Sequence, residues 1–281
     1  MKKFFKLLII TFCIAITAQT CLFAKPNVGL TDIQIIKKIK KLDKKINKHP
    51  DNSKLYIKRG YLKFCLKDYG SALEDYALAE DNDPKNSDIF YSKGRVWLER
   101  KNYIYALEEF NNALKINPKD SKIYLSRGIT NERLNNLDSA MKDFNLAIKY
   151  NRKSHSAYIN RGIVKDRQNN YQGAINDYEK ALKLCRYSPD AYYNMGLAKC
   201  KMGKYDEAID DFTKAIDQDP EFGLAYYKRG LAYLKLDNQQ FAKSDFIMAR
   251  QLRPIDKNIK EDLEKLQKQL NDMLKEEEIY Y

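Results

Sequence analysis

The stretch INRGIVKD, residues 159–166, places a glycine in the middle of a segment with the polar and apolar pattern of an amphipathic helix. Glycine in a helix interior costs about 1 kcal/mol relative to alanine, so Gly162 needs a physical reason. The same residue type recurs at intervals of 34 along the chain, without an insertion. The six glycines are Gly60, Gly94, Gly128, Gly162, Gly196 and Gly230.

Four further positions keep a fixed distance from each glycine. An aromatic residue precedes it by four positions, alanines follow it by 12 and 19, and a second aromatic follows it by 16. Around Gly162 these residues are Tyr158, Ala174, Ala181 and Tyr178. All six copies fill all five positions, which indicates an internal structural repeat.

This pattern resembles the tetratricopeptide repeat, a helix-turn-helix unit of 34 residues. The resemblance implies an all-α fold, a right-handed superhelical solenoid of such repeats with capping helices. Helix A of each repeat would carry the glycine, and helix B both alanines and the second aromatic. Small residues let two helices approach closely, so we expect Gly162 to face Ala174. The repeats are predicted at residues 53–86, 87–120, 121–154, 155–188, 189–222 and 223–256.

Serines and prolines mark the expected helix ends. Ser53, Ser87 and Ser121 are predicted to be N-caps of helix A. In the fifth repeat Ser188 and Pro189 take the N-cap and first helical positions. Prolines are expected just after helix B in four repeats, because proline cannot continue a helix. They are Pro84, Pro118, Pro220 and Pro254.

Charged residues also follow the repeat. Arg161 stands directly before its glycine, and Asp177 stands directly before the second aromatic of the same repeat. Five of the six repeats offer such a cation and an acid. We predict that each pair bridges helix A to helix B. The alternative is that both charges lie solvated on the surface, where a pair contributes only about 0 to 1 kcal/mol.

The first 24 residues have the layout of a secretory signal peptide. Lysines at positions 2, 3 and 6 precede an apolar run that ends at Ala24, after which we expect cleavage. Export to the periplasm or the cell exterior follows from this prediction. Two alternatives stay open: an uncleaved membrane anchor, and lipidation at Cys21 with attachment to the envelope.

Helices are also predicted on both sides of the repeats, because a solenoid needs its ends covered. Residues 25–52 form a basic segment in which residues 31–48 put four apolar residues on one helical face and seven lysines on the other. Thr31 and Gln34 match a capping box. Pro50 precedes Pro84 by 34, so this helix resembles a helix B without its partner. The alternative is that it lies on an anionic membrane. Residues 257–281 are expected to form a C-terminal capping helix and tail.

The residues that carry catalytic chemistry are sparse. The two histidines, His49 and His155, have no carboxylate or cysteine at a useful spacing, and no phosphate-binding loop, zinc-ligand cysteine pair or nucleophile elbow occurs. We therefore predict a non-enzyme without cofactor or metal. The formal net charge is +13, but part of this excess lies in residues 25–52, and export makes nucleic acid an unsuitable partner. We also expect a monomer.

The family resemblance implies that helix A lines a concave groove for a protein or peptide. We predict an exported, non-catalytic adaptor or scaffold; the alternative is an envelope-associated factor for assembly or secretion. Ile159 and Ile163 stand where a clamp for a terminal carboxylate would need polar groups. We therefore expect an apolar segment with hydrogen bonds from Asn160 and Asn194. The alternative is that part of the set packs between helices. The predicted set, here named the helix A stripe, is Ile57, Tyr61, Tyr91, Arg95, Leu125, Ile129, Ile159, Asn160, Ile163, Tyr193, Asn194, Leu197, Tyr227, Lys228 and Leu231.

Overall fold

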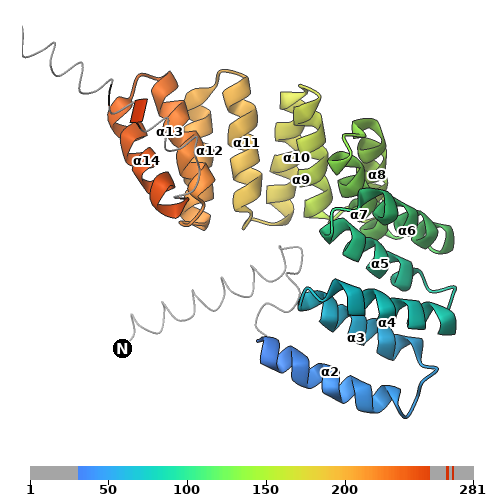
Figure 1. Cartoon of the computed structure of the whole chain (residues 1–281). Helices are drawn as coiled ribbons and strands as arrows, with labels where there is room; N and C mark the ends of the chain where they lie inside the picture. The colour runs from blue at the N-terminus through green and yellow to red at the C-terminus, as the bar shows by residue number, and fades with distance from the viewer. Residues whose placement is uncertain (1–30, 254–263, 266–267, 269–281) are drawn as a thin grey trace, which may run out of the picture. The chain divides into compact units, whose positions relative to one another are not determined.

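The computed structural model describes residues 31–253, 264, 265 and 268, and the elements in them are α-helices (Figure 1). The predicted signal peptide and most of the predicted C-terminal helix lie outside the described residues. Contacts divide the chain into two compact units, 1–164 and 165–281, with the boundary inside one helix, α9. Within each unit, consecutive helices run side by side (Figure 1). No helix in the described part of the chain is long and apolar enough to cross a bilayer.

Within residues 31–253, one single helix and six helix pairs follow each other along the chain. The single helix is α2 (Asp32–Ile46). The pairs are α3 (Ser53–Cys65) and α4 (Tyr69–Asn82), α5 (Ser87–Glu99) and α6 (Tyr103–Ile116), α7 (Ser121–Arg133) and α8 (Leu137–Tyr150), α9 (His155–Arg167) and α10 (Tyr171–Leu184), α11 (Pro189–Lys201) and α12 (Tyr205–Gln218), and α13 (Gly223–Lys235) and α14 (Gln239–Leu252). The first helix of each pair begins at the first residue of a predicted repeat. The fold is thus a helical-repeat solenoid.

The helix ends differ from prediction at one point. Ser53, Ser87 and Ser121 are the first helical residues and not the N-caps; the N-caps are the Asn or Asp residues before them. The Asp120 carboxylate accepts a hydrogen bond from the Lys122 backbone N–H at 2.8 Å, which satisfies a donor that the helix leaves unpaired. Ser188 and Pro189 take their predicted positions.

The turn between helix A and helix B contains a residue in the left-handed conformation in every repeat. Its φ lies between 58° and 75°. Gly203 is the glycine among them, and Asn135, Asn169 and Asp237 belong to residue types that tolerate this conformation, whereas Lys67 and Lys101 disfavour it. At the two lysines the turn is therefore imposed by the packing of the two helices. The six residues are Lys67, Lys101, Asn135, Asn169, Gly203 and Asp237.

The repeated glycines make room for the aromatic rings of helix B. A Cβ atom placed on Gly94 would lie 2.6 Å from Cε1 of Phe110, and one on Gly128 would lie 2.6 Å from Cε1 of Phe144. Both rings are completely buried. At each of the described repeat glycines the ring is the nearest neighbour, and at Gly60 and Gly230 the backbone oxygen of the predicted alanine, Ala72 or Ala242, also lies close, at 3.1 and 3.3 Å. Gly162 and Ala174 belong to different units, and their pairing stays a prediction.

The predicted charge pairs form between helices A and B. Arg127 Nη2 lies 2.6 Å from Asp143 Oδ1, and Arg229 Nη2 lies 2.7 Å from Asp245 Oδ1. Arg59 pairs likewise with Asp75, and Lys93 with Glu109. The three aspartates are buried, which excludes the solvated alternative for these pairs. The pair of Arg161 with Asp177 would join the two units and stays a prediction.

The same arginines also contact the preceding helix. Arg127 Nη1 donates to Asn111 Oδ1 of α6 at 2.8 Å, and Arg229 Nη1 donates to Thr213 Oγ1 of α12 at 2.9 Å. Each arginine therefore joins helix B of its own repeat to helix B of the repeat before it. Met195 breaks the series, and there Lys199 pairs with Asp211 at 2.7 Å. Burial raises the pKa of Asp211, and the Lys199 ammonium opposes this shift.

The contact between glycine and ring predicts that substitution by alanine changes the free energy of unfolding differently at different glycines. Gly94→Ala should destabilise the chain by about 1 to 3 kcal/mol, because overpacking against the Phe110 ring outweighs the gain in helix propensity. Gly70→Ala is the matched control, since nothing lies within 4 Å of its Cβ position, and it should be neutral or stabilising by up to about 1 kcal/mol. Urea unfolding followed by Trp97 fluorescence measures both. Equal stability of the two variants would contradict the packing account.

The charge pair predicts measurable coupling. A double-mutant cycle with Arg127→Ala and Asp143→Ala should give a coupling free energy of about 1 to 3 kcal/mol, because removing either partner leaves the other charge partly buried. The exposed pair of Lys204 and Glu207 is the control and should couple by less than about 0.5 kcal/mol. Thermal and urea unfolding provide the free energies. Coupling at Arg127 and Asp143 no larger than the control would refute the bridge.

Candidate binding surface on the A helices

The helix A stripe occupies equivalent positions on successive A helices. In the first unit its members lie on α3, α5, α7 and α9, and in the second on α11 and α13. All are half-buried except Leu125, which is buried. A partner can therefore contact part of nearly every side chain in the stripe, while the remainder packs into the protein.

Three of the four tyrosines of the stripe rest on the aromatic core of their own repeat. The ring centroid of Tyr91 lies 6.1 Å from that of Phe110, that of Tyr193 lies 5.9 Å from Phe212, and that of Tyr227 lies 5.8 Å from Phe246. These contacts hold the tyrosines in place. Burial raises the pKa of Tyr193, so its hydroxyl stays protonated at neutral pH. The stripe is thus partly core, as the alternative held, and presents rigid aromatic edges.

Two polar members of the stripe have local partners. The guanidinium of Arg95 lies over the rings of Phe64 and Tyr91, at 4.9 and 5.8 Å from their centroids. Asn160 donates from Nδ2 to the Ser156 carbonyl of its own helix at 2.8 Å. The Asn160 amide nitrogen is therefore engaged within its own helix.

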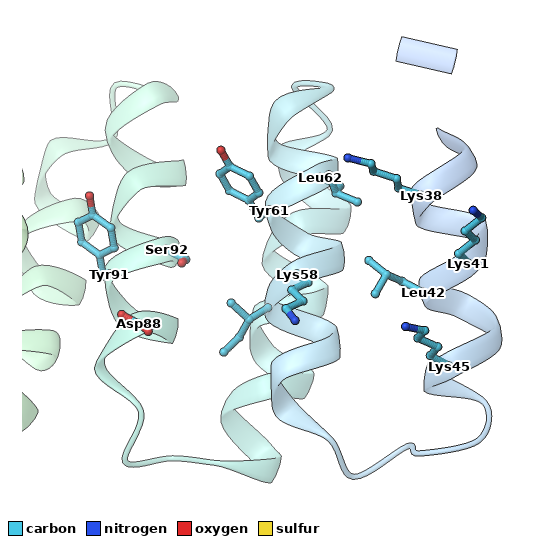
Figure 2. Close-up of a pocket in the computed structure, with 11 residues that line it drawn as sticks. Lys38, Lys41, Leu42, Lys45, Lys58, Tyr61, Leu62, Asp88, Tyr91 and Ser92 are labelled. Atoms are coloured by element: carbon cyan, nitrogen blue, oxygen red, sulfur yellow. The ribbon is translucent and has the colours of Figure 1, made fainter. Parts of the chain in front are cut away.

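A pocket of about 590 Å³ lies between α2, α3 and α5 in the first unit. Figure 2 shows Lys38, Leu42 and Lys45 on α2, with Tyr61 on α3 and Tyr91 on α5. Burial raises the pKa of Tyr61, which stays protonated at neutral pH. The pocket joins stripe members to lysines that the sequence pattern placed on the helical face opposite the apolar residues. Its lining is Lys38, Lys41, Leu42, Lys45, Ile57, Lys58, Tyr61, Leu62, Asp88, Tyr91 and Ser92.

The lysines of α2 could have been assigned to the pocket from the repeat spacing. Residues 34 positions after Lys38, Lys41 and Lys45 are Ala72, Asp75 and Ala79. In α4 these residues are buried, and Asp75 pairs with Arg59 of helix A. The corresponding face of α2 is therefore directed to the side on which a helix A packs. We predicted the helix B register of α2 but did not apply it to its lysines.

The pocket has the chemistry of a binding site. Its lining holds four lysines, apolar and aromatic groups, a single carboxylate and no histidine or cysteine. Across residues 31–253 and the three described positions beyond them, no group of three His, Cys, Asp or Glu side chains lies close enough to hold a metal ion. This arrangement suits an anionic and partly apolar ligand.

Comparison with solved structures finds the same fold. A tetratricopeptide repeat protein from Parabacteroides merdae is 22% identical, with a TM-score of 0.65, over 83% of this chain and 93% of that chain. PilW, a type IV pilus biogenesis factor, is 21% identical, with a TM-score of 0.70, over 75% and 98%. A chain of the Cut9–Hcn1 complex has a TM-score of 0.72 at 16% identity; this chain spans 52% of its length. A comparison with curated proteins gives no match.

Family models identify the repeat itself. Models described as tetratricopeptide repeat match residues 58–121, 121–154 and 189–222, and one described as TPR repeat matches residues 167–203. The matches fall in both units and overlap the first five of the six helix pairs, the fourth of them mainly through its second helix. The chain therefore carries tetratricopeptide repeats.

Proposed function

We propose that this protein is an exported, non-catalytic adaptor or scaffold that binds a protein or peptide partner along its helix A stripe. The observation that carries the proposal is that half-buried tyrosines on α5 in the first unit and on α11 and α13 in the second each rest on a buried ring. Tyrosine held in this way offers a large contact area at a small entropic cost, which suits a binding surface. The export part rests on the signal pattern of residues 1–24.

Similar structures support a role in protein interaction. One of them, YrrB, is described as a TPR protein with an unusual peptide-binding site; it is 21% identical, with a TM-score of 0.53 over 66% of this chain and 95% of that chain. PilW is described as a pilus biogenesis factor. For this chain we propose a partner with an apolar segment, because apolar side chains outnumber polar ones in the stripe.

An envelope-associated role is the second candidate, and one observation favours it. All seven lysines of residues 31–48 are exposed, so the segment can attract an anionic surface. On this alternative the protein acts in assembly or secretion at the membrane, held by this segment or by a lipid on Cys21.

The stripe predicts a loss of partners on removal of its tyrosines. Chemical crosslinking and affinity capture from the native envelope should recover fewer partners with Tyr193→Ala and Tyr227→Ala together than with the unchanged protein. The control is Tyr105→Ala with Phe241→Ala, two rings that are each 57% exposed on B helices. Identical partner sets for the stripe variant and the unchanged protein would contradict the proposal, and so would equal losses in both variants.

Fractionation separates the two candidates. A soluble adaptor should stay in the supernatant after cells are broken and membranes are sedimented, whereas an attached protein should pellet with the membranes. Release of the pelleted protein by high salt indicates attachment through the lysines of α2, because salt screens exposed charges. If the protein stays in the membrane pellet at high salt and the Cys21→Ala variant does not, the attachment is a lipid anchor. Recovery in the cytoplasmic fraction would contradict export.

A further inference from the structure

The position of α2 relative to α3 is that of a helix B relative to the next helix A. Arg59 Nη1 donates to Asp43 of α2 at 2.7 Å. Arg127 and Arg161 make the same contact with the residues 16 positions before them, Asn111 and Asn145, at 2.8 Å. The separation along the chain and the donor atom are the same in each case. The register of α2 is therefore fixed by contacts as well as by the sequence.

Because of this register, one face of α2 corresponds to the face with which helix B of a complete repeat packs against its own helix A. In α4 that face consists of Ala72, Asp75, Tyr76 and Ala79, all buried. In α2 it consists of Lys38, Lys41, Leu42 and Lys45, and these residues line the pocket. The pocket thus lies on the side of α2 where helix A packs in a complete repeat. A helix therefore has a shape that fits this side.

The charges on this face are the reverse of those in a complete repeat. Elsewhere helix A supplies a cation and helix B supplies the acid, as in Arg59 with Asp75. Lys41 stands at the position of that acid, so its partner must carry an acid where the repeats carry the cation. The lysines at the two alanine positions likewise favour acidic residues in the partner. Lys58 of α3 supplies a fourth ammonium group, against a single carboxylate, Asp88.

The remaining lining is apolar. Leu42, Ile57, Leu62 and the rings of Tyr61 and Tyr91 lie among the four lysines. An amphipathic helix matches this lining when it places apolar residues against these groups and acids along the flanks of its apolar face. Leu62 is only 8% exposed, so a side chain must enter the pocket to reach it, which a flat lipid surface does not do.

We propose that the pocket between α2, α3 and α5 binds an amphipathic helix of a partner protein that carries acidic residues beside its apolar face. The inference rests on the proposed protein-binding function and names the chemistry of one part of it. A second copy of this chain is a poor occupant, because five of its six A helices carry Arg or Lys at the position that would meet Lys41. Their like charges would repel.

A synthetic peptide tests the proposal. The probe is an acetylated and amidated peptide of about 18 residues, long enough to form a helix, with leucines on one face and glutamates beside them. Its two controls are the same peptide with lysines in place of glutamates, and a scrambled acidic peptide of equal composition. Fluorescence anisotropy with the full chain should show binding of the probe and of neither control.

Two protein variants locate the site. Lys38→Glu, Lys41→Glu and Lys45→Glu together should weaken binding of the acidic probe at least about tenfold and create binding of the lysine peptide. The matched control is Lys37→Glu, Lys40→Glu and Lys44→Glu, which changes the net charge equally through exposed residues of α2 outside the pocket. The affinity of this control variant for the acidic probe should change by no more than about twofold. Circular dichroism establishes that both variants fold.

Several outcomes would overturn the inference. They are failure of the probe to bind, binding of the scrambled peptide with equal affinity, and equal weakening by the two lysine sets. Binding to phosphatidylserine vesicles but not to the probe would assign this face to a membrane. If Tyr193→Ala and Tyr227→Ala together abolish the capture of native partners while neither set of lysine substitutions changes it, the proposed function stands and this inference alone fails.

Discussion

The approach of helix A to an aromatic ring 16 residues after its glycine, seen at Gly60, Gly94, Gly128, Gly196 and Gly230, sets the geometry on which the rest of the fold depends. At Gly94 and Gly128 a Cβ atom would lie 2.6 Å from the ring, so any larger residue must displace a buried phenylalanine. This contact fixes the separation of helices A and B. It also brings the cation beside the glycine to the acid beside the ring, so packing and ion pairing are set by adjacent residues.

The pairing of charges then links one repeat to the next. Arg127 contacts Asp143 on its own helix B and Asn111 on the helix B before it. Arg59 does the same with Asp75 and with Asp43 of α2, which extends the series beyond the first complete repeat. The opposite side of α2 is left to the pocket. The pocket is thus a consequence of the same register that builds the solenoid.

Much of the fold was predictable because six copies repeat one pattern without insertion. The helix starts, the charge pairs and the capping box of Thr31 with Gln34 all follow from local sequence. The N-caps were placed one residue late, because Asn and Asp directly before the serines compete for the role. The left-handed turn residues could not be predicted, since Lys67 and Lys101 disfavour a conformation that tertiary packing imposes. The pocket needed the three-dimensional meeting of α2, α3 and α5.

The central claim is that the A helices and not the B helices receive the partner. Hydrogen–deuterium exchange of the full chain, with and without a partner captured from the envelope, tests this claim directly. The account predicts slower exchange on binding at the partner-facing helices α5, α11 and α13, with little change at α6, α12 and α14. Protection confined to α6, α12 and α14 would contradict it.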